Sequence, residues 1–172
     1  MLLLHIVRGT PVHIWGLLAG LVALGVSQSR PRTLASARVA VMPVVLTALS
    51  LAGVAASFGV SAAALLAWLG GLGLALAAAP RLLPAPTAHW TASRDAVHVA
   101  GSWLPLALVV GLFATKYAAG ASLAIHPELS HETLFALPVG FAYGLFSGIF
   151  AARGWQMWRA RTTAPVAAPS AA

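Results

Sequence analysis

The segment 39–79 constrains the fold most, because its 41 residues include no charged side chain. A helix needs about 20 mainly apolar residues to cross the hydrocarbon layer of a membrane. The segment is therefore about twice as long as one span. We divide it near Phe58 and Ser61 into two antiparallel helices, at residues 39–58 and 61–79, joined by a very short turn.

Three further stretches are apolar and long enough to cross a membrane, at residues 11–28, 102–125 and 133–152. Of the 172 residues, 60% are hydrophobic and 8% are charged, whereas about 25% of the residues of a soluble domain are charged. Too little polar surface remains to face water. We expect an all-α integral membrane protein, a compact bundle of five transmembrane helices in a single domain over residues 1–163.

The longest polar interval, residues 80–101, separates the third helix from the fourth. Pro80, Pro84 and Pro86 are expected to end the third helix at residue 79 and to prevent it from restarting. Residues 89–91 and 96–99 have the composition of two short strands, which predicts a small hairpin in this loop. At the other extreme of the chain, residues 164–172 form an Ala/Pro/Ser tail that we expect to be disordered.

Loop arginines predict the orientation, because cytoplasmic loops are enriched in Lys and Arg. The five-span arrangement assigns Arg8 alone to one side. Merging the second and third spans would largely abolish this bias. The N-terminus is therefore predicted outside, with the C-terminus and the hairpin in the cytoplasm on the side that collects Arg30, Arg32, Arg38, Arg81, Arg94, Arg153, Arg159 and Arg161.

Gly140, Gly144 and Gly148 recur every four residues in the fifth span and so share one face of the helix. Small residues let helix backbones approach closely in lipid. We interpret this face as a packing surface, within the bundle or between copies of the chain. The expected partners are the lipid bilayer and, through such faces, other membrane proteins or a second copy.

Lys116 lies deep in the fourth predicted span, where an ionisable residue is a functional hypothesis by default. The chain has three acidic residues, Asp95, Glu128 and Glu132, and all are assigned to loops or helix ends. Lys116 therefore lacks a carboxylate partner in the membrane, and Tyr117 and Tyr143 are candidates to line an anionic ligand site with it. A structural role for an interior or snorkelling lysine is the alternative.

Two other groups of polar residues are candidate ligand sites. His126, Glu128 and His131 are weak candidates for a metal, but their spacing matches no strong zinc pattern, and solvated loop side chains are the alternative. The basic cluster of Arg30, Arg32 and Arg38 is expected to fix the orientation and to contact lipid headgroups, with a specific ligand as the alternative. We expect no cofactor, no bound metal and no nucleic-acid partner.

The sequence contains no P-loop, no G-x-S-x-G element and no H-E-x-x-H element, which are the usual signatures of an ATPase, a hydrolase or a metalloprotease. It also contains no cysteine, which excludes disulfides and thiol chemistry. A catalytic function is therefore unsupported by the sequence.

Several short elements resemble an uncharacterised family of small bacterial inner-membrane proteins. They are Met1 to Val7 with Pro11, Arg30-Pro31-Arg32, residues 101–106, Thr115-Lys116-Tyr117 and residues 143–148. The overall layout is also remotely similar to CcdC-type membrane proteins. The resemblance implies a multi-pass protein of the inner membrane and implies no activity.

Three functional hypotheses follow. The first is a non-enzymatic accessory or scaffold component of the membrane. The second is a small transporter or channel component that binds an anion near Lys116. The third is an enzyme that acts on lipid through His89 and His98 of the hairpin.

Overall fold

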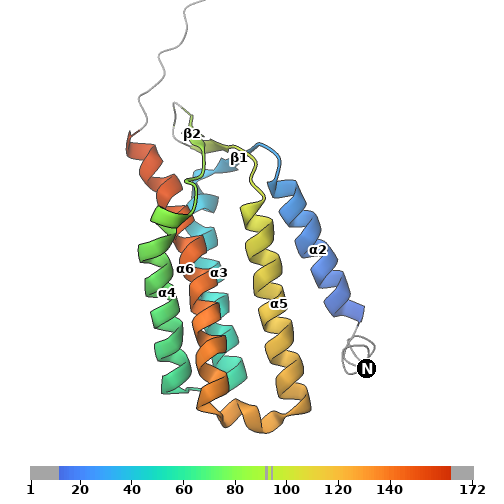
Figure 1. The fold of residues 1–172 in the computed structure, drawn as a ribbon. Helices are drawn as coiled ribbons and strands as arrows, with labels where there is room; N and C mark the ends of the chain where they lie inside the picture. The colour runs from blue at the N-terminus through green and yellow to red at the C-terminus, as the bar shows by residue number, and fades with distance from the viewer. Residues whose placement is uncertain (1–11, 92, 94, 164–172) are drawn as a thin grey trace, which may run out of the picture.

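The computed structural model describes residues 12–91, 93 and 95–163. This part has five long helices, which form a bundle with a small sheet at one end (Figure 1). The helices are α2 (Val12–Gln28), α3 (Ser36–Phe58), α4 (Ala62–Leu82), α5 (Leu104–Ile125) and α6 (Thr133–Thr163). A short 3-10 helix, η1 (Pro127–His131), joins α5 to α6 at the end opposite the sheet.

The division of the long apolar segment into two helices is confirmed. Between α3 and α4 the chain turns at Gly59, whose φ of +60° is a conformation that residues with a side chain rarely adopt. Ser61 then caps α4, because its Oγ accepts a hydrogen bond of 3.4 Å from the backbone N–H of Ala64. A turn of a few residues is therefore enough to reverse the chain.

Two helices extend past their predicted ends. Helix α4 continues through Pro80 to Leu82. Pro80 has no N–H to donate, so the helix loses one backbone hydrogen bond there and ends two residues later. Helix α6 continues from the expected residue 152 to Thr163, and its extra turns pack against the sheet, where the Trp90 indole N–H donates to the Met157 carbonyl at 3.0 Å.

The predicted hairpin is present as β2 (Ala88–Trp90) and β3 (Ala96–Val99), and a third strand extends it. Strand β1 (Arg32–Ala35), which was expected to be a loop, pairs antiparallel with β3, so the strand order is β1-β3-β2. The register places Leu34 opposite Val97, whose side chain is fully buried. Strand β1 thus ties the connection between α2 and α3 to the loop before α5.

The helices form two groups. Helices α3 and α4 pack against α6, and the main core lies among them around Val54, Trp68 and Tyr143, whereas α2 packs chiefly along α5. Helices α3, α4, α5 and α6 are long and apolar enough to cross a membrane, while α2 is shorter, with 17 residues. The fold is that expected of a membrane protein, with four such helices in the part of the chain that the structure describes.

Candidate functional site: a cavity lined by three arginines

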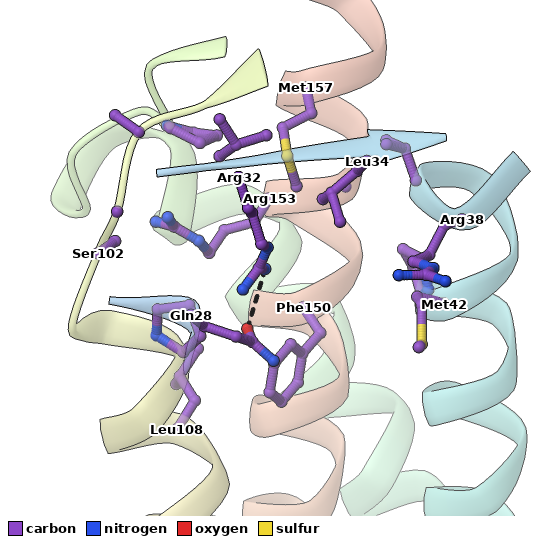
Figure 2. A pocket seen from close by; sticks show the side chains of 18 of the residues that line it. Gln28, Arg32, Leu34, Arg38, Met42, Ser102, Leu108, Phe150, Arg153 and Met157 are labelled. Atoms are coloured by element: carbon purple, nitrogen blue, oxygen red, sulfur yellow. Dashed lines mark hydrogen bonds between the residues drawn. The ribbon is translucent and has the colours of Figure 1, made fainter. Parts of the chain in front are cut away.

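A cavity of about 550 Å³ lies beneath the sheet, where the two groups of helices meet. Side chains from α2, α3, α5, α6 and β1 line it, together with the loops before β2 and after β3. Figure 2 shows that Arg32 descends from the strand and Arg153 reaches in from α6. The polar side chains in its wall are those of Ser27, Gln28, Arg32, Arg38, Thr87, Ser102 and Arg153.

Arg153 is the most deeply buried of the three arginines, with 8% of its surface exposed. Its Nη1 donates one hydrogen bond of 3.2 Å to the carbonyl oxygen of Pro84, and no carboxylate among the described residues pairs with it. A buried charge costs several kcal/mol unless it is paired. The positive charge of Arg153 is therefore available to bind a negative group.

Arg32 enters the same cavity from β1. Its Nη2 donates to Oε1 of Gln28 at 3.2 Å, the dashed line in Figure 2, while its Nε is buried and has no hydrogen-bond partner among the described residues. Burial lowers the pKa of Arg32, and the positive charge of Arg38 lowers it further. Both effects oppose the charged form, and a bound anion would counteract them by favouring the charged form.

Arg38 lies in the first turn of α3, on another wall of the cavity, and its side chain is exposed. No hydrogen bond or ion pair joins it to another described residue. The sequence has three acidic residues, Asp95, Glu128 and Glu132, and none of them lines the cavity. No carboxylate there balances the positive charge of the three arginines. Guanidinium groups bind carboxylate and phosphate oxygens through paired hydrogen bonds, so this arrangement suits an anion.

The structure brings together only some of the residues proposed around Lys116. The ammonium of Lys116 lies 5.9 Å from the centre of the Tyr143 ring, a cation–π distance, and a Cβ on Gly53 would be 3.3 Å from it. Tyr117 instead packs towards α2, with its ring centre 6.4 Å from that of Trp15. Lys116 and Tyr143 are thus brought together, and none of these residues lines the arginine cavity.

Gly140, Gly144 and Gly148 face α4. A Cβ on Gly140 would come within 2.6 Å of the carbonyl oxygen of Ala64, one on Gly144 would overlap that of Trp68, and one on Gly148 would meet Leu72 at 2.6 Å. The row lets the backbones of α4 and α6 touch. These three glycines therefore form a contact between two helices of the same chain.

The loop candidates for a metal lie around η1. The Nδ1 of His126 and Oε1 of Glu128 are 3.0 Å apart, and both side chains are exposed. A backbone hydrogen bond, and then the neighbouring His126, lower the pKa of Glu128. His131 lies nearby in the wall of a second, smaller cavity, but the described residues contain no group of three potential metal ligands.

Of the basic residues assigned to one side of the membrane, those that are described gather near the sheet end: Arg30, Arg32, Arg38, Arg81, Arg153 and Arg159. Arg30 is exposed and does not line the cavity. Arg8, Arg94, the side chain of Arg161 and the tail 164–172 lie outside the described residues.

The sequence interpretation missed Arg153 and Gln28 as site residues. Arg153 directly follows the fifth apolar stretch and was assigned to a loop, whereas it lies within α6 because the helix continues for ten more residues. Gln28 is the last residue of α2. A polar residue at the end of one apolar stretch and another directly after a second were the available signals, but they do not show which helix ends meet.

The fold and the cavity together define the class: a predominantly helical protein with apolar helices of membrane-spanning length and a cationic cavity at one end. The chain belongs to DUF6622, a family of unknown function, whose family model matches residues 1–167. No curated protein and no solved structure matches the chain. The family match agrees with the expected resemblance to an uncharacterised family, and it carries no link to CcdC-type proteins.

Proposed function

We propose that this protein is a non-enzymatic accessory component of the cell's inner membrane that holds an anionic ligand in the arginine cavity. One observation carries the proposal: Arg32, Arg38 and Arg153 line a single cavity in which there is no carboxylate. A bound anion would compensate the burial of Arg153 and give the Nε of Arg32 an acceptor.

The wall of the cavity favours binding over catalysis. Among its described residues there is no His, Asp, Glu, Lys, Cys or Tyr. General acid–base chemistry near neutral pH needs a group whose pKa lies near the working pH, and arginine stays protonated. The described wall of the cavity is therefore equipped to hold an anion and has no side chain suited to general acid–base chemistry near neutral pH.

A membrane arrangement with five spans and a cytoplasmic sheet is part of the proposal. Helix α2 runs beside α5 and would reach roughly 25 Å at 1.5 Å per residue, close to the thickness of the hydrocarbon layer. The gathering of arginines at the sheet end supports a cytoplasmic location for that end. The transporter hypothesis around Lys116 is not favoured, because Lys116 stands apart from the arginine cavity.

Thermal unfolding of the full chain in mild detergent tests anion binding, with phosphate compared with chloride at equal ionic strength. A ligand at about 100 times its Kd stabilises a protein by about 2.7 kcal/mol. Phosphate should therefore raise the Tm of the wild-type protein and of Arg81→Gln, a matched control whose side chain is exposed and outside the cavity.

The rise should be lost in Arg153→Gln. Arg38→Gln provides a second test that is less exposed to folding defects, because the Arg38 side chain is exposed and makes no hydrogen bond to a described residue. An unchanged Tm in the wild-type protein, or an equal rise in all four proteins, would contradict the proposal.

A further inference from the structure

We propose that the anion is the phosphate headgroup of an anionic glycerophospholipid, with one of its acyl chains in the apolar part of the same cavity. This inference rests on the proposed function, because it names the class of ligand that the arginine cavity holds.

The cavity has a polar part and an apolar part. The arginines and Ser102 lie towards the sheet, whereas Gln28 reaches Arg32 from below, beside Phe150 (Figure 2). Figure 2 shows Leu108 and Phe150 below Arg32 and Arg153, on the side away from the sheet. An inorganic anion would use the polar part alone, whereas an amphiphile would use both.

The cavity as a whole extends far enough along the helices to take part of an acyl chain. On α2 the wall runs from Gln28 back to Leu21, and on α3 it runs from Arg38 to Leu46. At 1.5 Å per residue these seven and eight residues correspond to roughly 10 Å along each helix. Each methylene group buried there would add about 0.8 kcal/mol of transfer free energy.

The cavity also reaches the side of the bundle. Leu24 of α2 and Met42 of α3 line it, yet 54% and 50% of their surfaces are exposed. Helix α2 packs along α5, and its packing against α3 is at most slight. An acyl chain can therefore enter from the hydrocarbon layer between α2 and α3 without passing through water.

The level of the charges fits a headgroup. Arg32 and Arg38 lie where α2 ends and α3 begins, at the end of the bundle where helices give way to the sheet. Phosphates lie at this level in a bilayer, directly outside the hydrocarbon layer, and basic pockets between helices on the cytoplasmic side attract anionic headgroups. The positive charge of the arginines and their level in the bilayer both favour a phospholipid headgroup.

Native mass spectrometry of the full chain in mild detergent tests the inference, with dioleoyl phosphatidylglycerol and dioleoyl phosphatidylcholine added in equal amounts. The two lipids share their acyl chains and differ in net charge. We expect one phosphatidylglycerol per chain, retained at least tenfold over phosphatidylcholine. Arg38→Gln and Arg153→Gln should each reduce this preference severalfold, and Arg30→Gln, an exposed arginine outside the cavity, should retain it.

A second pair of variants tests the acyl chain. Leu46→Trp fills the apolar part, whereas Leu49→Trp places the same ring on the same helix at an exposed position outside the cavity. We expect Leu46→Trp to lower phosphatidylglycerol retention at least fivefold without changing the Tm rise in phosphate, and Leu49→Trp to leave both unchanged.

The outcomes separate this inference from the proposed function. If phosphate raises the Tm through the arginines but phosphatidylglycerol is not preferred, or if Leu46→Trp leaves lipid retention unchanged, the lipid assignment is overturned and anion binding stands. If neither phosphate nor phosphatidylglycerol binds, the proposed function fails together with the inference.

Discussion

Ser50 shows how single polar residues hold the interior of the bundle together. The indole N–H of Trp68 on α4 donates to the Ser50 hydroxyl at 3.2 Å, and that hydroxyl donates to the carbonyl of Tyr143 on α6 at 3.1 Å. Ser50 itself is on α3 and is 7% exposed. One buried hydroxyl therefore links three helices.

Replacing Ser50 with alanine should destabilise the protein by about 1 kcal/mol, because the Trp68 N–H would lose its acceptor. Unfolding in mixed micelles with increasing denaturing detergent measures the change. Ser57→Ala is the control, because Ser57 is half-buried on the same helix and makes no side-chain hydrogen bond to another described residue. Equal stability of Ser50→Ala and the wild-type protein would show that the link contributes nothing.

At the scale of elements, the contact between α4 and α6 depends on the absence of side chains at a few positions. A Cβ on Gly144 would overlap the Trp68 carbonyl, and one on Gly71 would overlap that of Phe141. Glycines on both helices therefore allow the two backbones to come close together. The period of four in the sequence was sufficient to predict a packing face on α6, but it could not identify α4 as the partner.

Gly144→Ala should separate α4 from α6 locally and cost about 1–3 kcal/mol, the usual effect of adding volume to a closely packed contact. Gly73→Ala is the matched control, because a Cβ at Gly73 on α4 would meet nothing within 4 Å. That change should be neutral or stabilising by up to about 1 kcal/mol, since glycine disfavours helix. The same unfolding assay compares both variants, and equal effects would refute the contact.

Helix positions followed from the sequence because mainly apolar runs of about 20 residues have one stable solution in lipid. The ends were harder to predict. The last turns of α6 contain Arg153 and Arg159, which interrupt the apolar run. Contacts with the sheet hold these turns, such as the Trp90–Trp158 ring contact at 6.2 Å. Strand β1 likewise depends on β3, from which it is separated by two helices in the chain. Such distant pairings leave no local pattern.

For the whole molecule, the candidate site could be predicted only in part. Arg32 and Arg38 were identified as a basic cluster with lipid headgroups as partners, since loop charge is visible in a sequence. Arg153 joins them because α6 packs beside α3, where a Cβ on Gly154 would meet Pro43 at 2.5 Å. The cavity is therefore a product of how the two groups of helices meet under the sheet.

We propose that the bundle crosses the membrane with the sheet and the arginine cavity on the cytoplasmic side. The sequence contains no cysteine, so a single introduced cysteine can be labelled without background. Ser93 in the hairpin and His131 at the opposite end are both exposed and suit this substitution.

In intact cells, a membrane-impermeant maleimide should label His131→Cys and should label Ser93→Cys only after the membrane is permeabilised. Labelling of Ser93→Cys in intact cells, with or without labelling of His131→Cys, would rule out a cytoplasmic location for the sheet.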